Sequence, residues 1–451
     1  MSDLHAHTNL WLGKPAPRYT SYPPATQFKP LPAEQTALHL AELASSTTPI
    51  SLYLHIPFCR SLCLFCGCHQ VITQRAERIS AYLDALHQEI DLVHQQLGKR
   101  LSVSHLHFGG GSPSTLTPQQ FDALMTHLRR CFEFVAGAEL AIELDPRTTT
   151  PAYVEALARN GINRASLGVQ DFNPQVQQTI HRVQPLEMVA GVMQRLRASG
   201  ITALSLDLMY GLPHQTAASL QQTAQQALEL DPARISLFSY AHVPGFKTYQ
   251  KALEQAGLPD DVAKLQQEAA MRTVFTQAGY VAVGIDHFAK ADDPLARAAL
   301  AGQLGRNFQG YTDDVAPQLL GLGASSISDT GARYVQNEPD LEAYQAALAA
   351  GVLPLRRHCV RDARDQRRED VIRELMCNFT TDLSAHALKA DEYGSEFADA
   401  LTRLQPYIKA GLVHMNGARV MVDTTYRMAV RMVASCFDEY YDPRKISSRV
   451  A

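Results

Sequence analysis

Between about residues 50 and 280, short strand-like runs alternate with longer stretches of helical periodicity, and the alternation repeats six times. Parallel strands need crossovers of a dozen or more residues, so such a series predicts a parallel sheet covered by helices. We therefore expect an α/β fold here. The expected strands are 51–56, 105–108, 140–144, 164–169, 204–209 and 234–240, and the expected helices are 79–97, 118–131, 152–159, 174–180, 186–198, 217–230 and 260–278.

Unusual residues stand at the C-terminal ends of these strands, one strand after another. In β/α barrels that rim carries the active site. The pattern therefore favours a barrel or partial barrel over an open sheet. The residues are the four cysteines after the first strand, Gly109–Pro113, Glu143, Asp145, Gln170, Asp207 and Tyr240–His242.

Cys59, Cys63, Cys66 and Cys68 lie within ten residues, and the first three have the spacing C-x3-C-x2-C. Three thiolates from one short loop can hold three irons of a [4Fe–4S] cluster, which leaves the fourth iron open for a small molecule. Only one residue separates Cys66 from Cys68, so we expect Cys68 to point away from the cluster, toward a substrate.

Two other sites remain compatible with the same cysteines. Structural zinc usually draws on two well-separated pairs of Cys or His ligands, and no second pair accompanies this loop. A closed cluster held by all four thiolates would serve electron transfer. We favour the three-cysteine cluster over both.

Other rim residues suggest how a ligand would be held. The run Phe108-Gly-Gly-Gly-Ser-Pro113 lets a ligand approach the backbone closely, although a tight β–α turn would also explain it. Glu143 is suited to accept a hydrogen bond from an ammonium or ribose hydroxyl group. Asp207 lies between Leu206 and Leu208, and an acid in an apolar strand needs a partner.

The two ends of the chain differ from the barrel. We divide the chain into an N-terminal segment (1–49), a β/α barrel (50–355) and a smaller, mainly helical C-terminal domain (356–451). A helix is expected over 32–43. The C-terminal part has expected helices over 367–378, 396–410 and 426–437, and Asn416-Gly417 predicts a hairpin, so the part resembles a winged-helix module.

Composition excludes several classes of function. The 451 residues are 46% hydrophobic and 19% charged, with a net charge of -4. No basic cluster accompanies the hairpin, so we expect no nucleic-acid partner and read the C-terminal domain as a lid or packing domain. We see no signal peptide and no membrane-spanning run, which predicts a cytoplasmic protein without membrane contact.

The cysteine loop after the first barrel strand resembles the signature of the radical S-adenosylmethionine (SAM) superfamily. Within it, the chain is similar to the oxygen-independent coproporphyrinogen III oxidase family from about residue 15 to its end. The matching segments are Pro17–Pro23, Tyr53–Cys59, Cys66–Cys68, Gly168–Phe172, Asp207–Pro213, Tyr240–His242, Arg306–Thr312 and Gly321–Ser328.

The resemblance implies roles for single residues. Cys59, Cys63 and Cys66 would bind the [4Fe–4S] cluster. A first SAM would be held by Tyr53, Phe65, Gly110, Glu143 and Ile327. A second SAM would be surrounded by Gly111, Ser112, Gln170, Arg182, Asp207 and Ala241. The residues implied in catalysis are Tyr53, Cys68, Glu143 and Phe308.

The resemblance also implies the reaction. A 5′-deoxyadenosyl radical would take hydrogen from a propionate β-carbon of coproporphyrinogen III, and loss of CO2 and one electron would leave a vinyl group. Two such events give protoporphyrinogen IX. Arg18 and Arg182 would suit the substrate carboxylates. We further expect an electron donor such as a flavodoxin or ferredoxin, and a monomer.

Three rival functions stay open. Radical SAM haem chaperones lack the fourth cysteine and carry a His-Asn-x-x-Tyr-Trp motif, whereas this chain has Cys68 and a single tryptophan, Trp11. A two-SAM methyltransferase would release S-adenosylhomocysteine. A zinc-stabilised interaction module would show no iron absorbance.

Overall fold

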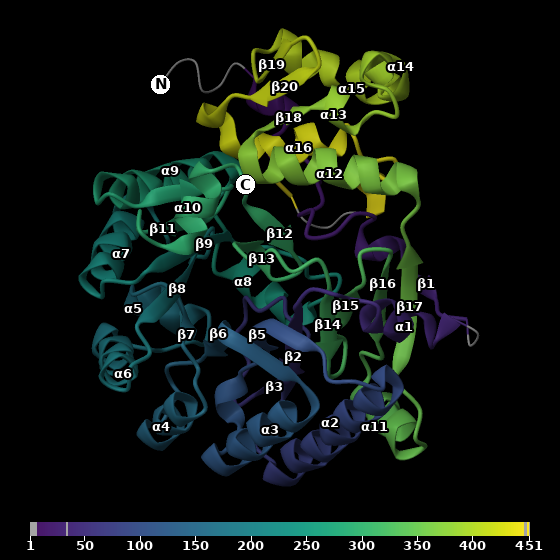
Figure 1. Cartoon of the computed structure of the whole chain (residues 1–451). Coiled ribbons are helices and arrows are strands. Elements are labelled where there is room, and N and C mark those ends of the chain that lie inside the picture. The colour runs from purple at the N-terminus through teal and green to yellow at the C-terminus, as the bar shows by residue number, and fades with distance from the viewer. Residues whose placement is uncertain (1–6, 33–34, 446–448, 451) are drawn as a thin grey trace.

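A computed structural model describes residues 7–32, 35–445 and 449–450. Its centre is a sheet of 13 strands in the order β1-β17-β16-β15-β14-β2-β5-β6-β7-β8-β9-β11-β10 (Figure 1). The strands from β14 to β9 in this order are mutually parallel. The edge strands β1 and β10 do not pair with each other, so the sheet is a partial rather than a closed barrel. The parallel strands are β14 (Leu319–Leu322), β2 (Ile50–Ile56), β5 (Ser102–Gly110), β6 (Glu133–Leu144), β7 (Arg164–Gln170), β8 (Ala203–Tyr210) and β9 (Arg234–Ser239).

The six expected β/α units are confirmed. Their helices lie outside the sheet; those of the first five units connect consecutive parallel strands, and those of the sixth follow the last parallel strand, β9 (Figure 1). The helices are α2 (Ala76–Leu97), α3 (Pro118–Cys131), α4 (Pro151–Arg159), α5 (Pro174–Thr179), α6 (Leu186–Ala198), α7 (Ala217–Glu229), α8 (Lys251–Gln255) and α9 (Asp261–Gln277).

Local signals explain why these helices begin where they do. Thr117 and Gln120 form a capping box at the start of α3, and Pro118 occupies the first helical position. The apolar face of α3 then packs into the main core through Phe121, Leu124 and Leu128. The capping signal and the buried face agree, which is why the expected bounds of this helix match the observed ones.

Antiparallel strands, which were not predicted from the sequence, flank the parallel ones. They are short and lack a clear alternation of apolar and polar residues. On one side lie β15 (Ile327–Asp329), β16 (Arg333–Asn337), β17 (Leu355–Val360) and β1 (Lys29–Pro30); on the other lie β11 (His287–Ala289) and β10 (Val281–Val283). The expected boundary after residue 355 falls inside β17, and the division into three domains stays a prediction.

The remaining elements lie around these strands. Helix α1 (Leu38–Ala44) begins later than the expected helix over 32–43, of which residues 33 and 34 lie outside the described part. The other short elements are β3 (Phe58–Cys59), β4 (Val71–Ile72), α10 (Pro294–Leu300), β12 (Gly305–Asn307), β13 (Gly310–Thr312) and α11 (Leu341–Ala349).

The C-terminal unit forms the upper part of Figure 1. The expected hairpin is confirmed as β19 (Val413–Asn416) and β20 (Arg419–Val422), and a third strand, β18 (Thr380–Asp382), pairs with β20. Its helices are α12 (Ala363–Asn378), α13 (Leu383–His386), α14 (Tyr393–Glu396), α15 (Ala398–Lys409) and α16 (Val430–Ser435).

The N-terminal segment packs into the core of this C-terminal unit. Trp11, Tyr19 and Tyr22 are buried there among side chains of α12 and α16. Burial of each large side chain contributes about 1.5–3 kcal/mol. The first and last parts of the chain therefore build one hydrophobic core.

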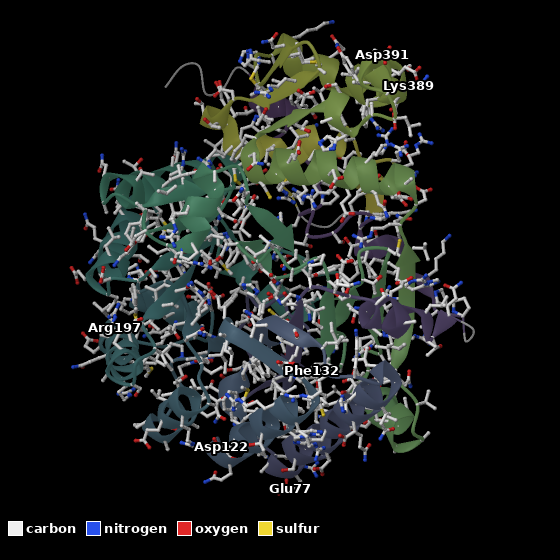
Figure 2. The ribbon with its side chains drawn as sticks, in the orientation of Figure 1. Glu77, Asp122, Phe132, Arg197, Lys389 and Asp391 are labelled. Atoms are coloured by element: carbon white, nitrogen blue, oxygen red, sulfur yellow. The ribbon has the colours of Figure 1, made fainter. Side chains whose placement is uncertain are left out.

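Polar side chains cover the outside of the molecule. Figure 2 shows Glu77 and Lys389 pointing outward, whereas Phe132 lies inside and is fully buried. Within residues 7–32, 35–445 and 449–450, no helix combines the length and the apolar character needed to cross a lipid bilayer.

Candidate active site

The cysteine loop begins where β2 ends. Strands β3 and β4 pair in parallel at the two ends of the loop, with Cys59 opposite Ile72. Backbone amides of the glycine run bind the start of the loop. Gly111 donates to the carbonyl oxygen of Ile56 and Ser112 to that of Phe58, both at 2.8 Å. The loop is therefore anchored on both sides to the rim of the barrel.

All four cysteines line one cavity of about 160 Å³, which we call the cysteine cavity. Cys63 is buried, Cys59 and Cys66 are half-buried, and Cys68 is exposed. The side chains of Cys66 and Cys68 hydrogen-bond to each other. That Cys68 stands outside the metal-ligand set remains a prediction. The other walls come from Ser61, Phe65, Gln70, Ile72, Gly110, Gly111, Ser112, Glu143, Leu144, Asp145, Arg147, Gly168, Gln170, Arg182 and Asp207.

Glycine is required where β5 meets the cysteine loop. A Cβ atom on Gly111 would lie 2.7 Å from the carbonyl oxygen of Phe58. Gly110 has a φ of +115°, and its Cβ atom would lie 2.6 Å from the His55 ring. The glycine run thus lets two backbone segments and the cavity wall approach one another.

Glu143 stands at the end of β6 and faces this cavity. Its Oε1 accepts a hydrogen bond from Nε2 of His107 at 3.0 Å, and its Oε2 accepts one from the backbone N–H of Gly110 at 3.3 Å. The carboxyl side chain is 43% exposed. It is positioned by neighbours on β5 yet keeps lone pairs for a ligand.

Positive charge is concentrated beside Cys63. Guanidinium groups of Arg147 and Arg182 both donate to its Sγ at 3.4 Å, and both pair with Asp145, at 2.7 and 3.3 Å. Burial acts to raise the pKa of Asp145, but the charges of Arg182 and Arg147 outweigh it and lower the pKa. Asp145 is therefore ionised and holds two cations against the cysteine sulfur.

This donor set fits an iron–sulfur cluster. Three cysteine sulfurs converge on one cavity, and hydrogen bonds from cations to cluster sulfurs are a usual means of stabilising and tuning such clusters. The glycine backbone leaves room beside the sulfurs. Cys59, Cys63 and Cys66 would hold the cluster, and Arg147 and Arg182 would balance its negative charge.

Asp207 lies on β8 at the far wall of the same cavity. Burial first, and the charge of Glu143 second, raise the pKa of Asp207 to about 6, although hydrogen bonds from Ser166 and Ser236 oppose the rise. The acid predicted to need a partner therefore has two hydroxyl partners. Its charge remains costly until a ligand donates to it.

A hydrogen-bonded chain leads from Tyr53 on β2 away from the cavity. The hydroxyl group of Tyr53 contacts Nδ1 of His55 at 3.0 Å, and Nε2 of His55 contacts the carbonyl oxygen of His69 at 3.0 Å. Burial lowers the pKa of His55 to about 4, so its ring is neutral. Because a carbonyl oxygen only accepts, Nε2 carries the proton and Nδ1 accepts from Tyr53.

Most of the predicted site residues meet at the cysteine cavity, but four do not line it. Tyr53 lies behind it, with its ring 3.0 Å from the position of a Cβ atom on Gly109. Ile327 lies on β15, against Gly321. Phe308 lines two larger cavities and packs edge-on against Tyr334, with ring centroids 5.4 Å apart. Ala241 belongs to one of those larger cavities.

A segment that holds the cysteine loop from outside was not predicted from the sequence. Lys247, Tyr249 and Gln250, in the loop after β9, donate hydrogen bonds to carbonyl oxygens of Cys68, Cys66 and Phe65. Arg147 was not predicted as a site residue either. No local pattern marks these residues, because their contacts join parts of the chain 84 to 185 residues apart.

Comparisons with known proteins agree with this geometry. A model of the radical SAM superfamily matches residues 53–227. An oxygen-independent coproporphyrinogen III oxidase of Bradyrhizobium diazoefficiens is 44% identical over 430 residues, which is 95% of each chain. The enzyme of the same name from Escherichia coli is 41% identical over 433 residues, covering 94% of this chain and 93% of the relative. A solved structure of coproporphyrinogen III oxidase from Escherichia coli, described as a radical SAM enzyme, is similar with a TM-score of 0.89 and 39% identity, covering 94% of this chain and 98% of that one.

Proposed function

Because this chain belongs to the oxygen-independent coproporphyrinogen III oxidase family of radical SAM enzymes, we infer that it oxidises coproporphyrinogen III without oxygen, in haem synthesis. Each of two propionate side chains loses a hydrogen atom, CO2 and one electron and becomes a vinyl group, which gives protoporphyrinogen IX. The observation that carries this function is the convergence of Cys59, Cys63 and Cys66 on one cavity at the rim of the barrel, in a chain that matches the family over nearly its whole length.

The enzyme uses a [4Fe–4S] cluster and SAM. When bound, they supply the carbon-centred radical that abstracts hydrogen from the substrate. Arg147 and Arg182 hold positive charge against the cluster side of the cavity. The glycine run at Gly110 and Gly111 lets the amino acid portion of SAM reach the backbone.

We assign the ammonium group of the first SAM to Glu143. Its carboxylate is fixed by His107 and Gly110, so it is already oriented when a ligand arrives. Tyr53, Phe65 and Ile327 would complete this site, as the family resemblance implies. Tyr53 is held by the neutral His55, which keeps its ring against the glycine run.

We further propose a second SAM beside the first. Gly111, Ser112, Gln170, Arg182 and Asp207 share the cysteine cavity, and Ala241 lies in the adjoining larger cavity. Asp207 suits a ribose hydroxyl or ammonium donor because its buried charge gains from any added donor. Cys68 and Phe308 would act on the substrate side of these cofactors.

The setting of the reaction is also proposed. A carbon radical must be kept from solvent, and the N-terminal segment with the C-terminal unit would provide that cover. A flavodoxin or ferredoxin would deliver electrons to the cluster. We propose a monomer in the cytoplasm, with no nucleic-acid or membrane partner.

Anaerobic turnover tests this function. Purified enzyme with a reconstituted cluster is incubated with coproporphyrinogen III, SAM and a reductant, and tetrapyrroles are separated by chromatography. Formation of the divinyl product together with 5′-deoxyadenosine supports the assignment. Stable haem binding without turnover would instead identify a haem chaperone, and S-adenosylhomocysteine as product would identify a methyltransferase.

A further inference from the structure

Two large cavities of nearly equal size lie between the barrel and the C-terminal unit. One has a volume of about 650 Å³ and the other about 630 Å³, both within the range of ligand-binding pockets. They share Thr20, Arg306 and Phe308, so the N-terminal segment and the β12–β13 hairpin stand between them. Size alone does not tell which of them receives the substrate.

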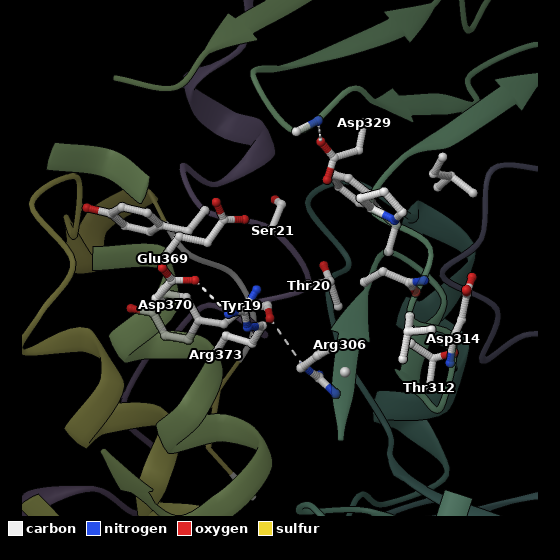
Figure 3. A pocket seen from close by; sticks show the side chains of 18 of the residues that line it. Tyr19, Thr20, Ser21, Arg306, Thr312, Asp314, Asp329, Glu369, Asp370 and Arg373 are labelled. Atoms are coloured by element: carbon white, nitrogen blue, oxygen red, sulfur yellow. Dashed lines mark hydrogen bonds and ion pairs between the residues drawn. The ribbon is translucent and has the colours of Figure 1, made fainter. Parts of the chain in front are cut away.

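Charge separates the two cavities. The larger one, which we call the acidic cavity, has more carboxyl groups than basic groups in its wall. Figure 3 shows the carboxyl groups of Asp314, Asp329, Glu369 and Asp370 around it. Its acids are Asp314, Asp329, Glu369, Asp370 and Glu374, and its basic side chains are Arg306, Arg361 and Arg373.

The other cavity, which we call the basic cavity, has the opposite balance. Its basic side chains are Arg18, Lys264, Arg306, Arg431 and Arg449, and its acids are Asp260, Asp261 and Asp286. The acids already have partners: Asp260 caps α9, Asp261 pairs with Lys264 at 3.3 Å, and Asp286 pairs with His287 at 2.7 Å. Five basic side chains face three acids, so the wall carries an excess of positive charge.

Two of these arginines have donors to spare. Arg306 uses Nε and Nη2 on the carbonyl oxygens of Arg18 and Tyr19, but its buried Nη1 has no hydrogen-bond partner among the described residues. The Arg18 side chain is exposed, and it forms no hydrogen bond or ion pair with any residue that the structure describes. Donors of this kind are what an incoming carboxylate would satisfy.

Arg431 has a structural role and is not one of the arginines with spare donors. It is buried and donates to backbone oxygens of Ala16, Pro17 and Arg449, so it holds the N-terminal segment in place. Burial, together with the charges of Arg18 and Arg306, lowers its pKa to about 9. Like charges brought this close are costly unless an anion accompanies them.

The position of the basic cavity agrees with the chemistry. Tyr210, Ser239 and Tyr240, at the C-terminal ends of β8 and β9, form one side of it, next to Ala241. Asp207 of the cysteine cavity lies on the same strand as Tyr210. A ligand in the basic cavity would therefore border the rim where the radical is generated.

We propose that the basic cavity receives the tetrapyrrole substrate, and that Arg18, Arg306 and Lys264 bind its propionate carboxylates. The proposal rests on the proposed function, since it names where that substrate is held. The sequence led us to expect that Arg182 binds the substrate carboxylates. The proposal replaces Arg182, because its guanidinium group is already bound to Gly168, Asp145 and Cys63. The acidic cavity would repel the same ligand.

Equilibrium binding tests the cavity without turnover. The probe is coproporphyrin III, the oxidised porphyrin with the same four carboxylates, titrated into the full-length cluster-loaded protein while porphyrin fluorescence is followed. We expect R18Q and K264Q each to raise Kd about tenfold, and the double variant more. R373Q, in the acidic cavity, should leave Kd unchanged, and the tetramethyl ester of the porphyrin should bind much more weakly than the acid.

The assignment is overturned if the R18Q/K264Q double variant keeps the wild-type Kd, if R373Q weakens binding as much, or if the ester binds as tightly. Circular dichroism and iron content check that each variant is folded and loaded. Turnover assays separate the two proposals. Charge-dependent porphyrin binding without divinyl product supports the cavity and refutes the reaction, whereas product formation with unchanged Kd and KM in the double variant refutes the cavity alone.

Discussion

The hydroxyl group of Tyr249 donates a 2.6 Å hydrogen bond to the carbonyl oxygen of Cys66, across 183 residues of sequence. Lys247 and Gln250 bind the carbonyl oxygens of Cys68 and Phe65 in the same way, at 2.7 and 3.1 Å. Gln250 also donates to the carbonyl oxygen of Ala241, which lines the basic cavity. The loop after β9 thus ties the cysteine loop to the wall of the neighbouring cavity.

Replacing Tyr249 by Phe should loosen the cysteine loop. The change removes one hydrogen bond, worth about 1 kcal/mol, and leaves the ring in place. We expect faster loss of iron on dialysis against a chelator and a broadened electron paramagnetic resonance signal of the reduced cluster. Y280F is the matched control, since the Tyr280 hydroxyl makes a 2.6 Å bond to the carbonyl oxygen of Pro232, outside the site. Equal iron loss in both variants would contradict this role of Tyr249.

The four loop cysteines should divide into two groups. C59S, C63S and C66S each remove a ligand, so we expect little iron and no cluster absorbance after anaerobic reconstitution. C68S should keep the cluster and lose turnover. Cys131 is buried in α3, and C131S should retain both cluster and activity apart from any loss of stability. A cluster-free C68S protein would mean that Cys68 is a ligand.

Glu143→Gln should weaken SAM binding while sparing the cluster. The amide keeps the bond to the backbone of Gly110 only if its oxygen faces that N–H, and it carries no charge for an ammonium group. A charge-assisted hydrogen bond is worth about 1.5–3 kcal/mol, so we expect Kd for SAM to rise by roughly ten- to a hundredfold. Calorimetry on the reconstituted protein measures it. An unchanged Kd would remove Glu143 from the SAM site.

Asp207 should make stability depend on pH in a defined direction. Its folded-state pKa is raised to about 6, mainly by burial, from an ordinary value of 3.8. The folded state then binds more protons than the unfolded state between these values, so stability contributed by the neutral acid is present at pH 4 and lost as pH rises to 6. The loss is on the order of 2 kcal/mol.

Asp207→Asn should remove that loss, because the amide stays neutral and still accepts from Ser166 and Ser236. Thermal unfolding should show the variant more stable than the parent at pH 7.5 and similar to it at pH 4. Equal stabilisation at both values would show that the charge of Asp207 is not responsible.

Of two glycines in the cysteine site, one should not tolerate replacement by alanine and the other should. A Cβ atom on Gly111 meets the backbone of Pro57 and Phe58 within 2.8 Å, which cannot give way cheaply. Gly67 lies between Cys66 and Cys68, and nothing lies within 4 Å of a Cβ atom built on it. We therefore expect G111A to lose cluster and stability, and G67A to keep both, as measured by iron content and melting temperature.

The parts of the fold that were predictable are those in which local and tertiary signals agree. Helix α3 matched its expected bounds because Thr117 caps it, Pro118 starts it and one face is apolar. The strands from β10 to β17 were missed, since most have three to five residues, too few to show an alternating pattern, and β11, β14 and β17 also pair with β9, β2 and β1, which lie farther away in sequence. Local pattern carries no information about such partners.

The site shows the same division. The cysteine spacing and the acids at strand ends could be found because parallel strands bring their C-terminal ends to one rim. The contacts that these residues make with parts of the chain distant in sequence could not be predicted. Arg182 looked suited to a substrate carboxylate, yet it is bound to Cys63 and Asp145, and Arg306 gains its significance only from meeting Arg18 across 288 residues.

The joining of Trp11, Tyr19 and Tyr22 to the core around α16 has a consequence for biosynthesis. Lys14 accepts a hydrogen bond from the backbone of Val450, and Arg431 holds Ala16 and Pro17. During synthesis on the ribosome, Trp11, Tyr19 and Tyr22 therefore cannot be buried until α16, near the end of the chain, has been made. The cover that we propose for the reaction would then be the last part of the molecule to form, and a product truncated before α16 would leave the basic cavity without one of its walls.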